Sequence, residues 1–135
     1  MALRLIDTGV WIDFLRRSDT AARKRLLELV EQPDSVVTTQ PVLMEIRQGV
    51  SGDALRKVNR VLGGLSVLDV DPQLDFDHAA DIFRGVRATG HTVRSSMDCL
   101  IAAVALRNNV TLVHKDADFD RIARAVPQML VEPVH

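Results

Sequence analysis

Eight consecutive apolar residues near the end of the chain, the segment CLIAAVAL at 99–106, constrain the fold more than any other feature. Ser95 or Ser96 can cap a helix that begins just before this segment. Such a helix is apolar nearly all round, and a helix without a polar face belongs in the middle of a structure. The rest of the chain must therefore supply the layers that cover it.

Short apolar strand patterns alternate with helical patterns along the sequence. We expect strands at residues 3–6, 35–39, 66–70 and 110–114, with residues 129–131 as a candidate short fifth strand. This alternation is typical of an α/β fold, in which helices flank a central parallel sheet of four to five short strands. No linker or internal repeat interrupts the pattern, so we expect one domain over residues 1–135.

The apolar spacing between these strands predicts two pairs of helices. Residues 10–15 and 26–30 are expected to form a helical hairpin after the first strand. Residues 40–50 and 53–62 are expected to form the second pair, which ends at two glycines.

A longer helix is expected between the third strand and the buried helix. Pro72 opens it, and it closes near Gly90. Its expected apolar face consists of Phe76, Ala79, Ala80, Phe83 and Val86. The aromatic residues of the chain sit at helical spacing that suits a core: Trp11, Phe14, Phe76, Phe83 and Phe119.

Four acidic residues are expected at one edge of the sheet. Ligands of open parallel sheets bind outside the carboxyl ends of the strands, where the following helices begin. Asp7 follows the first strand, Asp116 follows the fourth, and Asp98 lies in the first turn of the buried helix that leads to the fourth. Glu45 lies in the helix that follows the second strand. We therefore expect these carboxylates to form one cluster.

Carboxylates that converge on a mostly apolar edge repel one another, so a protein keeps them together with a cation or a shared proton. Oxygen ligands point to Mg²⁺ or Mn²⁺. Such an ion can activate a water molecule and stabilise the charge that grows on a phosphate. The cluster thus predicts hydrolysis of phosphodiester bonds.

Each acid also has a structural interpretation. Asp7 and Asp98 could cap helices, and Glu45 could be a solvated helix residue. Asp116, together with Asp118 and Asp120, could be the acidic start of the last helix. The joint arrangement favours a site, because four independent helix residues need not meet at one edge.

Three segments carry a resemblance to a known family: LIDTGVWIDFL, PVLMEIRQG and TVRSSMDCLIAAVALRNNVTLVHKDADFDRIA. Over essentially its whole length, the chain resembles PIN-domain nucleases, in particular the VapC-like toxins of VapBC type II toxin–antitoxin systems. The resemblance implies a three-layer sandwich and an endoribonuclease that uses Mg²⁺, or Mn²⁺, to cleave tRNA or another structured RNA. It also implies a VapB-like antitoxin as partner and a homodimer.

The resemblance also implies roles for individual residues. Asp7, Glu45, Asp98 and Asp116 would be the family's acidic quartet, with Asp7, Asp98 and Asp116 as metal ligands. Asp118 would be a fifth ligand or a helper behind the others, and Arg94 would contact a substrate phosphate. A solvated loop arginine is the alternative for Arg94.

Two positions depart from the family pattern. Gly9 stands where the family usually has serine, and His114 where it usually has threonine or serine. Either hydroxyl could bond a carboxylate or water of the site, so the supporting contacts must differ here. His114 could replace the hydroxyl as a hydrogen-bond partner, but a structural role is favoured.

Other functions remain open from the sequence. A catalytically weak PIN-fold module that binds RNA or a partner would keep the fold without cutting. A more distant alternative is a retroviral-type aspartic protease, because Asp7-Thr8-Gly9 matches its motif, although such proteases are all-β. Dehalogenase-like phosphotransfer enzymes need a second acid where this chain has Gly9.

Charge and targeting signals bound the setting. The chain has 17 Lys and Arg residues against 18 Asp and Glu residues. Without the five acids of the expected site, the remaining surface is net positive by four, which allows an RNA-binding rim. Cys99 is the only cysteine, and no segment approaches the roughly 20 apolar residues that cross a bilayer. We therefore expect a cytoplasmic protein without membrane contact.

Overall fold

The computed structural model describes residues 2–32 and 34–135 and shows a parallel five-stranded sheet in the order β3-β2-β1-β4-β5. The strands are β1 (Arg4–Ile6), β2 (Val36–Thr38), β3 (Ser66–Val67), β4 (Thr111–His114) and β5 (Val131–Pro133). Every adjacent pair is parallel. The α/β prediction is confirmed. The first four strands lie within the predicted ranges, and β5 begins two residues later than expected.

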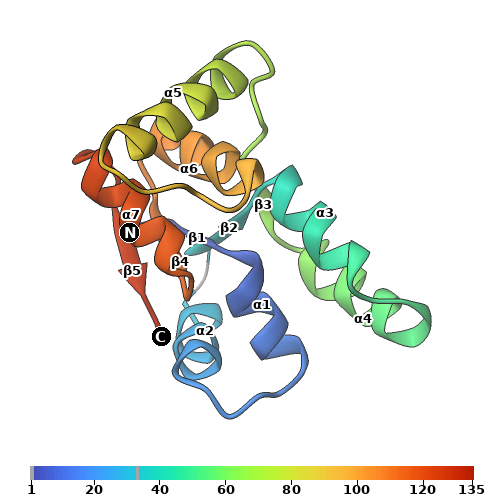
Figure 1. Ribbon diagram of the computed structural model, residues 1–135. Helices are drawn as coiled ribbons and strands as arrows, with labels where there is room; N and C mark the ends of the chain where they lie inside the picture. Colours follow the sequence, from blue (N-terminus) through green and yellow to red (C-terminus); the bar gives the residue numbers. More distant parts are fainter. Residues whose placement is uncertain (1, 33) are drawn as a thin grey trace.

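Seven helices flank the sheet in the described part of the chain (Figure 1). Helices α1 (Thr8–Leu15) and α2 (Ala21–Val30) form the predicted hairpin, and α3 (Gln40–Gln48) and α4 (Gly52–Leu62) the second pair. Helices α5 (Leu74–Ala88), α6 (Ser96–Asn108) and α7 (Ala117–Ala125) complete the fold. Figure 1 shows α5 and α6 on one side of the sheet, α1 and α2 on the other, and the α3–α4 pair projecting as an arm.

Helix α6 is the buried helix that the apolar segment predicts. Ser95 is its N-cap, and its side chain accepts a hydrogen bond from the Met97 backbone N–H at 3.2 Å. All residues from Asp98 to Ala105 are buried. Small alanine side chains on α6 let α5 pack closely over it, so the helix lies between α5 and the sheet.

The predicted apolar face of α5 is partly wrong. Ala79 and Val86 are buried as expected, but Phe83 is half-buried, and Phe76 and Ala80 are exposed. The buried face of α5 is rotated and consists of Asp75, Ala79, Ile82 and Val86. Trp11 and Phe119 are core residues as predicted, Phe14 is half-buried, and Phe76, 56% exposed, is not a core residue.

A buried ion pair explains the rotation of α5. Asp75, 1% exposed, accepts hydrogen bonds from Arg107 Nε and Nη2, both at 2.9 Å, and from the Asp71 backbone N–H at 2.8 Å. Arg107 lies in the last turn of α6. Turning Asp75 inward toward this arginine carries Phe76, the next residue, out to the surface.

The fold decides one of the alternatives. A retroviral-type protease is all-β, whereas this chain has a parallel sheet covered by helices. The protease interpretation of Asp7-Thr8-Gly9 is therefore wrong. Among residues 2–32 and 34–135, no helix combines the length and apolar character that crossing a membrane would require.

Candidate active site

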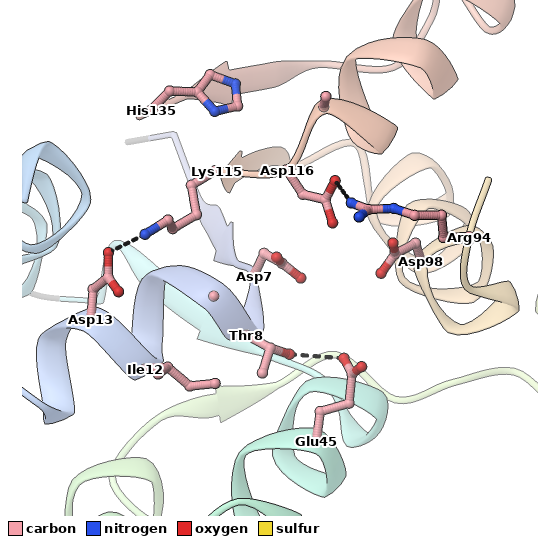
Figure 2. A pocket seen from close by; sticks show the side chains of 12 residues that line it. Asp7, Thr8, Ile12, Asp13, Glu45, Arg94, Asp98, Lys115, Asp116 and His135 are labelled. Carbon is pink, nitrogen blue, oxygen red and sulfur yellow. Dashed lines mark hydrogen bonds and ion pairs between the residues drawn. The ribbon is translucent and has the colours of Figure 1, made fainter. Parts of the chain in front are cut away.

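The predicted acids meet at the carboxyl edge of the sheet. Asp7 is the residue between β1 and α1, Asp98 lies in the first turn of α6, and Asp116 is the N-cap of α7. Glu45 reaches the same place from α3. Together with Arg94, these four residues line an open cavity of about 580 Å³ (Figure 2).

Asp7 is buried at the floor of this cavity. Its side chain makes no capping hydrogen bond, although its backbone is in the N-cap position of α1. Burial raises the pKa of Asp7 to about 7; the backbone N–H groups of Thr8 and Gly9 oppose the rise, and the Glu45 carboxylate adds to it. The environment of Asp7 therefore disfavours a lone negative charge.

Asp98 has the same conflict. Burial raises its pKa to about 8, and the nearby carboxylates of Asp7, Asp116 and Glu45 add to the rise. The capping bond of α6 is made by the Ser95 hydroxyl. Two neighbouring buried carboxyls thus resist ionisation near neutral pH. This behaviour is expected of groups that share a cation.

Asp116 is both a helix cap and a wall of the cavity. Its Oδ1 accepts a hydrogen bond from the Asp118 backbone N–H at 2.9 Å and from Arg94 Nη2 at 3.0 Å. Asp116 thus stands at the acidic start of the last helix, as one interpretation of the sequence predicted, and caps it as well; neither position excludes a site role. Figure 2 shows the Arg94 side chain beside Asp116 and Asp98, at the mouth of the site.

Asp118 lies behind the cavity wall and is fully buried. One of its oxygens accepts from Arg121 at 2.6 Å, and the other from the Arg94 backbone N–H and Nε at 3.0 and 3.2 Å. Burial alone would raise the pKa of Asp118, but these hydrogen bonds outweigh it and hold the pKa below its usual value. Asp118 thereby fixes the position of Arg94.

Residues that the sequence did not point to complete the cavity. The Thr8 hydroxyl donates a hydrogen bond to Glu45 Oε1 at 2.8 Å and so orients that carboxylate (Figure 2). Lys115 pairs with Asp13 on the side of the cavity opposite Arg94. The position of Thr8 directly after Asp7 was the only signal for the first contact, and nothing in the spacing of Asp13 and Lys115 indicates the second.

The two departures from the family pattern have structural reasons. A Cβ on Gly9 would lie 3.3 Å from Lys115 Cγ, so a serine side chain would require the lysine stem to shift by a few tenths of an ångström. His114 is completely buried at the end of β4, and its Nδ1 accepts a hydrogen bond from the Asp116 backbone N–H at 3.1 Å. Burial lowers the pKa of His114, against the opposing effect of Asp120.

The donor set fits a hard divalent cation. Carboxylate oxygens of Asp98 and Asp116 lie within 4.8 Å of each other, with an oxygen of Asp118 at the same range behind them, and Asp7 lines the same cavity. Mg²⁺ and Mn²⁺ prefer such oxygen ligands. A cation there would offset the burial and the carboxylate repulsion that together raise the pKa values of Asp7 and Asp98.

Comparisons with known proteins show which proteins this chain resembles in sequence and in fold. Ribonuclease VapC11 of Mycobacterium tuberculosis strain H37Rv is 42% identical over 122 residues, which cover 89% of this chain and 91% of the relative. Ribonuclease VapC51 of the same strain is 31% identical, with 95% and 91% covered. The crystal structure of VapBC2 from Rickettsia felis bound to promoter DNA contains a chain with a TM-score of 0.76 and 20% identity, with 97% and 98% covered.

A match to a family model identifies the family of the chain. The family model described as "PIN domain" matches residues 4–125, a range that contains Asp7, Glu45, Asp98 and Asp116. The matched range therefore includes all four acids that the fold brings to one cavity. The chain belongs to the PIN-domain family.

Proposed function

We propose that this chain is a metal-dependent endoribonuclease that acts as the toxin component of a type II toxin–antitoxin system. The observation that carries the proposal is the pair of buried carboxyls, Asp7 and Asp98, with pKa values raised to about 7 and 8 in an open cavity. Relatives with 42% and 31% identity are named as VapC ribonucleases. Both facts support RNA hydrolysis over a module that binds without cutting.

The contacts of each acidic residue indicate its role in catalysis. Asp7, Asp98 and Asp116 would hold Mg²⁺ or Mn²⁺, which when bound supplies positive charge to the reacting phosphate and acidifies water. Glu45 is oriented by Thr8 through Oε1, which leaves Oε2 to take a proton from the attacking water. Asp118 already accepts hydrogen bonds on both oxygens, so we assign it to holding Arg94 rather than to binding metal.

Arg94 is placed to bind the substrate. Its side chain is 76% exposed, and its contacts with Asp116 and Asp118 use Nη2 and Nε. Nη1 remains for a phosphate oxygen of RNA. Because Asp118 fixes the guanidinium plane, the arginine is pre-organised for that contact. A site that reads phosphates suits a structured RNA such as tRNA, whose shape then selects the cleavage point.

A second surface fits the antitoxin. An apolar groove lies between the α1–α2 hairpin and the α3–α4 arm, and its apolar lining includes Phe14, Leu15, Leu27, Val50, Val58 and Val61. Its basic lining residues are Arg16, Arg17, Arg23, Lys57 and Arg60. We propose that an amphipathic antitoxin helix with acidic flanks binds here. Homodimer formation and a cytoplasmic location, where RNA is available, belong to the same proposal.

Cleavage of RNA by the purified protein tests the function. We expect cleavage with added Mg²⁺ or Mn²⁺, none in EDTA, and no cleavage of peptides. Asp7→Asn should lower the rate by orders of magnitude, whereas Asp81→Asn, at an exposed site on α5, should not. Undiminished cleavage in excess EDTA would contradict the proposal, and RNA binding without cleavage under all metal conditions would favour the catalytically weak module.

A further inference from the structure

The His114 side chain contacts the candidate metal ligand Asp116 through the backbone. The ring is completely buried between Phe119, at a centroid distance of 5.3 Å, and His135, at 5.6 Å. Nδ1 accepts the Asp116 N–H at 3.1 Å. On the other side of the ring, Nε2 lies 3.2 Å from Asp120 Oδ1, off the axis of a well-aligned hydrogen bond.

These contacts tie three consecutive pieces of structure together. His114 ends β4, Asp116 is the N-cap of α7, and Asp120 lies in the first turn of α7. The Asp116 carboxylate is held by Arg94 and by the Asp118 N–H, and the Asp116 carbonyl accepts the Phe119 N–H at 3.1 Å, so the Asp116 N–H is the polar group of this residue that still has freedom to move. The bond to His114 removes that freedom.

We propose that His114 is a positioning residue of the active site: its Nδ1 accepts the Asp116 N–H, fixes the backbone of Asp116 and thereby aims the Asp116 carboxylate into the cavity. The proposal rests on the proposed function in one respect, namely the role of Asp116 as a metal ligand. The contact between His114 and Asp116 is independent of that function. It gives the departure from a hydroxyl residue at position 114 a role in the site.

The tautomer of the ring decides between this role and another. A neutral imidazole carries one proton, so Nδ1 can accept from Asp116 only if the proton is on Nε2. The carboxylate of Asp120 attracts the proton to that nitrogen.

Nε2 could alternatively be a metal ligand, because ligand atoms of His114, Asp120 and His135 lie within 4.8 Å of one another. Binding a metal through Nε2 would move the proton to Nδ1, where it would face the Asp116 N–H. The geometry therefore favours positioning over a second metal site.

Nitrogen NMR of the metal-free protein tests the contact directly. We expect Nε2 of His114 to carry the proton, Nδ1 to be unprotonated, and the Asp116 amide to be protected from hydrogen exchange. Wild type should show no change in the Nε2 signal when Zn²⁺ is added at low micromolar concentration. A proton on Nδ1, or a Zn²⁺-dependent shift of Nε2, would overturn the proposal.

Two variants of similar shape test the consequence. His114→Asn keeps an acceptor at the position of Nδ1, and His114→Leu removes it, while both lose the outer half of the ring. We expect His114→Leu to lose protection of the Asp116 amide and to bind Mn²⁺ about 10-fold more weakly, and His114→Asn to stay within about threefold of wild type. RNA cleavage should follow the same order.

The melting temperatures of the two variants should follow the opposite order to their Mn²⁺ affinities. This difference distinguishes a positioning role of His114 from a role in core packing. Asn buries an amide N–H₂ without a partner, so His114→Asn should melt below His114→Leu. If Mn²⁺ affinity instead falls in step with melting temperature, or falls equally in both variants, His114 is merely a core residue. If wild type itself binds no Mn²⁺ and cuts no RNA, the proposed function fails, and the NMR experiment still decides the contact.

Discussion

Asp98 is a residue whose proposed function as a metal ligand should lower the stability of the metal-free protein. Its carboxyl is buried in the first turn of α6, where a negative charge would favour the helix dipole, yet its neighbours are the carboxyls of Asp7, Asp116 and Glu45. Burial and repulsion outweigh the dipole, because the pKa is raised to about 8 rather than lowered. In the metal-free protein, ionised Asp98 should therefore be a destabilising group.

Asp98→Asn is predicted to stabilise the metal-free protein. The folded carboxyl, with a pKa of about 8, binds its proton more tightly than the unfolded one at 3.8, so ionisation costs stability as pH rises between those values. Asn cannot ionise, so its gain should grow through this window and level off above it. Melting temperatures of both proteins across the window, with an expected rise of about 4 °C for each kcal/mol of repulsion removed, check this.

The matched control is Asp77→Asn, an exposed acid in the first turn of α5. It should melt slightly lower than wild type, because it loses only a dipole interaction of roughly 0.3 to 1 kcal/mol. Mg²⁺ should stabilise wild type and Asp77→Asn equally, and Asp98→Asn less. An Asp98→Asn protein that melts lower and responds to Mg²⁺ like wild type would make Asp98 an ordinary capping residue.

The acids of the site could be predicted at the residue scale, but their supporting contacts could not. Asp7 directly follows β1 and Asp116 lies two residues after the end of β4, so topology alone brings them to one edge. The role of Asp118 depends on which donors reach its oxygens, and Arg94 and Arg121 meet it only in the folded chain. The pairing of Lys115 with Asp13 joins residues 102 positions apart, which no local pattern encodes.

At the scale of elements, one buried ion pair sets the packing of α5 on α6. Apolar spacing predicted the existence of α5, but gave it a face centred on Phe76 and Phe83 instead of Asp75 and Ile82. Hydrophobic periodicity assigns every aspartate to the solvent side, including the buried Asp75. The face of α5 predicted in this way is therefore shifted by about one residue from the buried face. The same reasoning succeeds for α6, where all the buried positions but Asp98 are apolar.

Asp75→Asn is predicted to destabilise the fold by about 2 to 3 kcal/mol at neutral pH, below the usual 3 to 5 for a buried pair because Arg107 is 31% exposed. Burial would raise the pKa of Asp75, but Arg107 and the Asp71 N–H outweigh it and lower the pKa below 3.8. A group with a lowered folded pKa stabilises the protein above its unfolded pKa, and this contribution is lost as pH falls through the folded value.

The difference in unfolding free energy between wild type and Asp75→Asn should therefore be constant near neutral pH and shrink below about pH 4. Urea unfolding at several pH values measures it. RNA cleavage of the folded variant should be unchanged, since Asp75 lies outside the cavity that holds Asp7 and Asp98. A constant difference down to the lowest pH would show that Asp75 stabilises the fold through packing instead of charge.

At the scale of the whole molecule, the described residues leave two surfaces with exposed apolar side chains uncovered. One is the groove between the α1–α2 hairpin and the α3–α4 arm, where Leu27 and Val61 are 39% and 40% exposed among arginines and lysines. The other lies between α5 and α6 around Phe76 and Phe83, and among residues 2–32 and 34–135 its one charged lining residue is Arg84. The basic border of the first surface suits an acidic antitoxin helix, and the nearly uncharged second surface suits a copy of the same chain.

Substitutions on the two surfaces are predicted to disrupt antitoxin binding and self-association independently of each other. Leu27→Glu places a negative charge in the apolar floor of the first groove, where it would be desolvated against an acidic partner. It should weaken binding of a VapB-like antitoxin by roughly 10-fold or more and leave self-association unchanged. Phe76→Glu, the matched control, should do the reverse and convert a dimer to a monomer. Titration calorimetry with the antitoxin and sedimentation of the isolated protein measure both effects. RNA cleavage by Leu27→Glu alone should be unaltered, and its inhibition should require more antitoxin than wild type does. If Phe76→Glu abolished antitoxin binding and Leu27→Glu did not, the antitoxin would occupy the α5–α6 surface, and the charge argument for the first groove would be wrong.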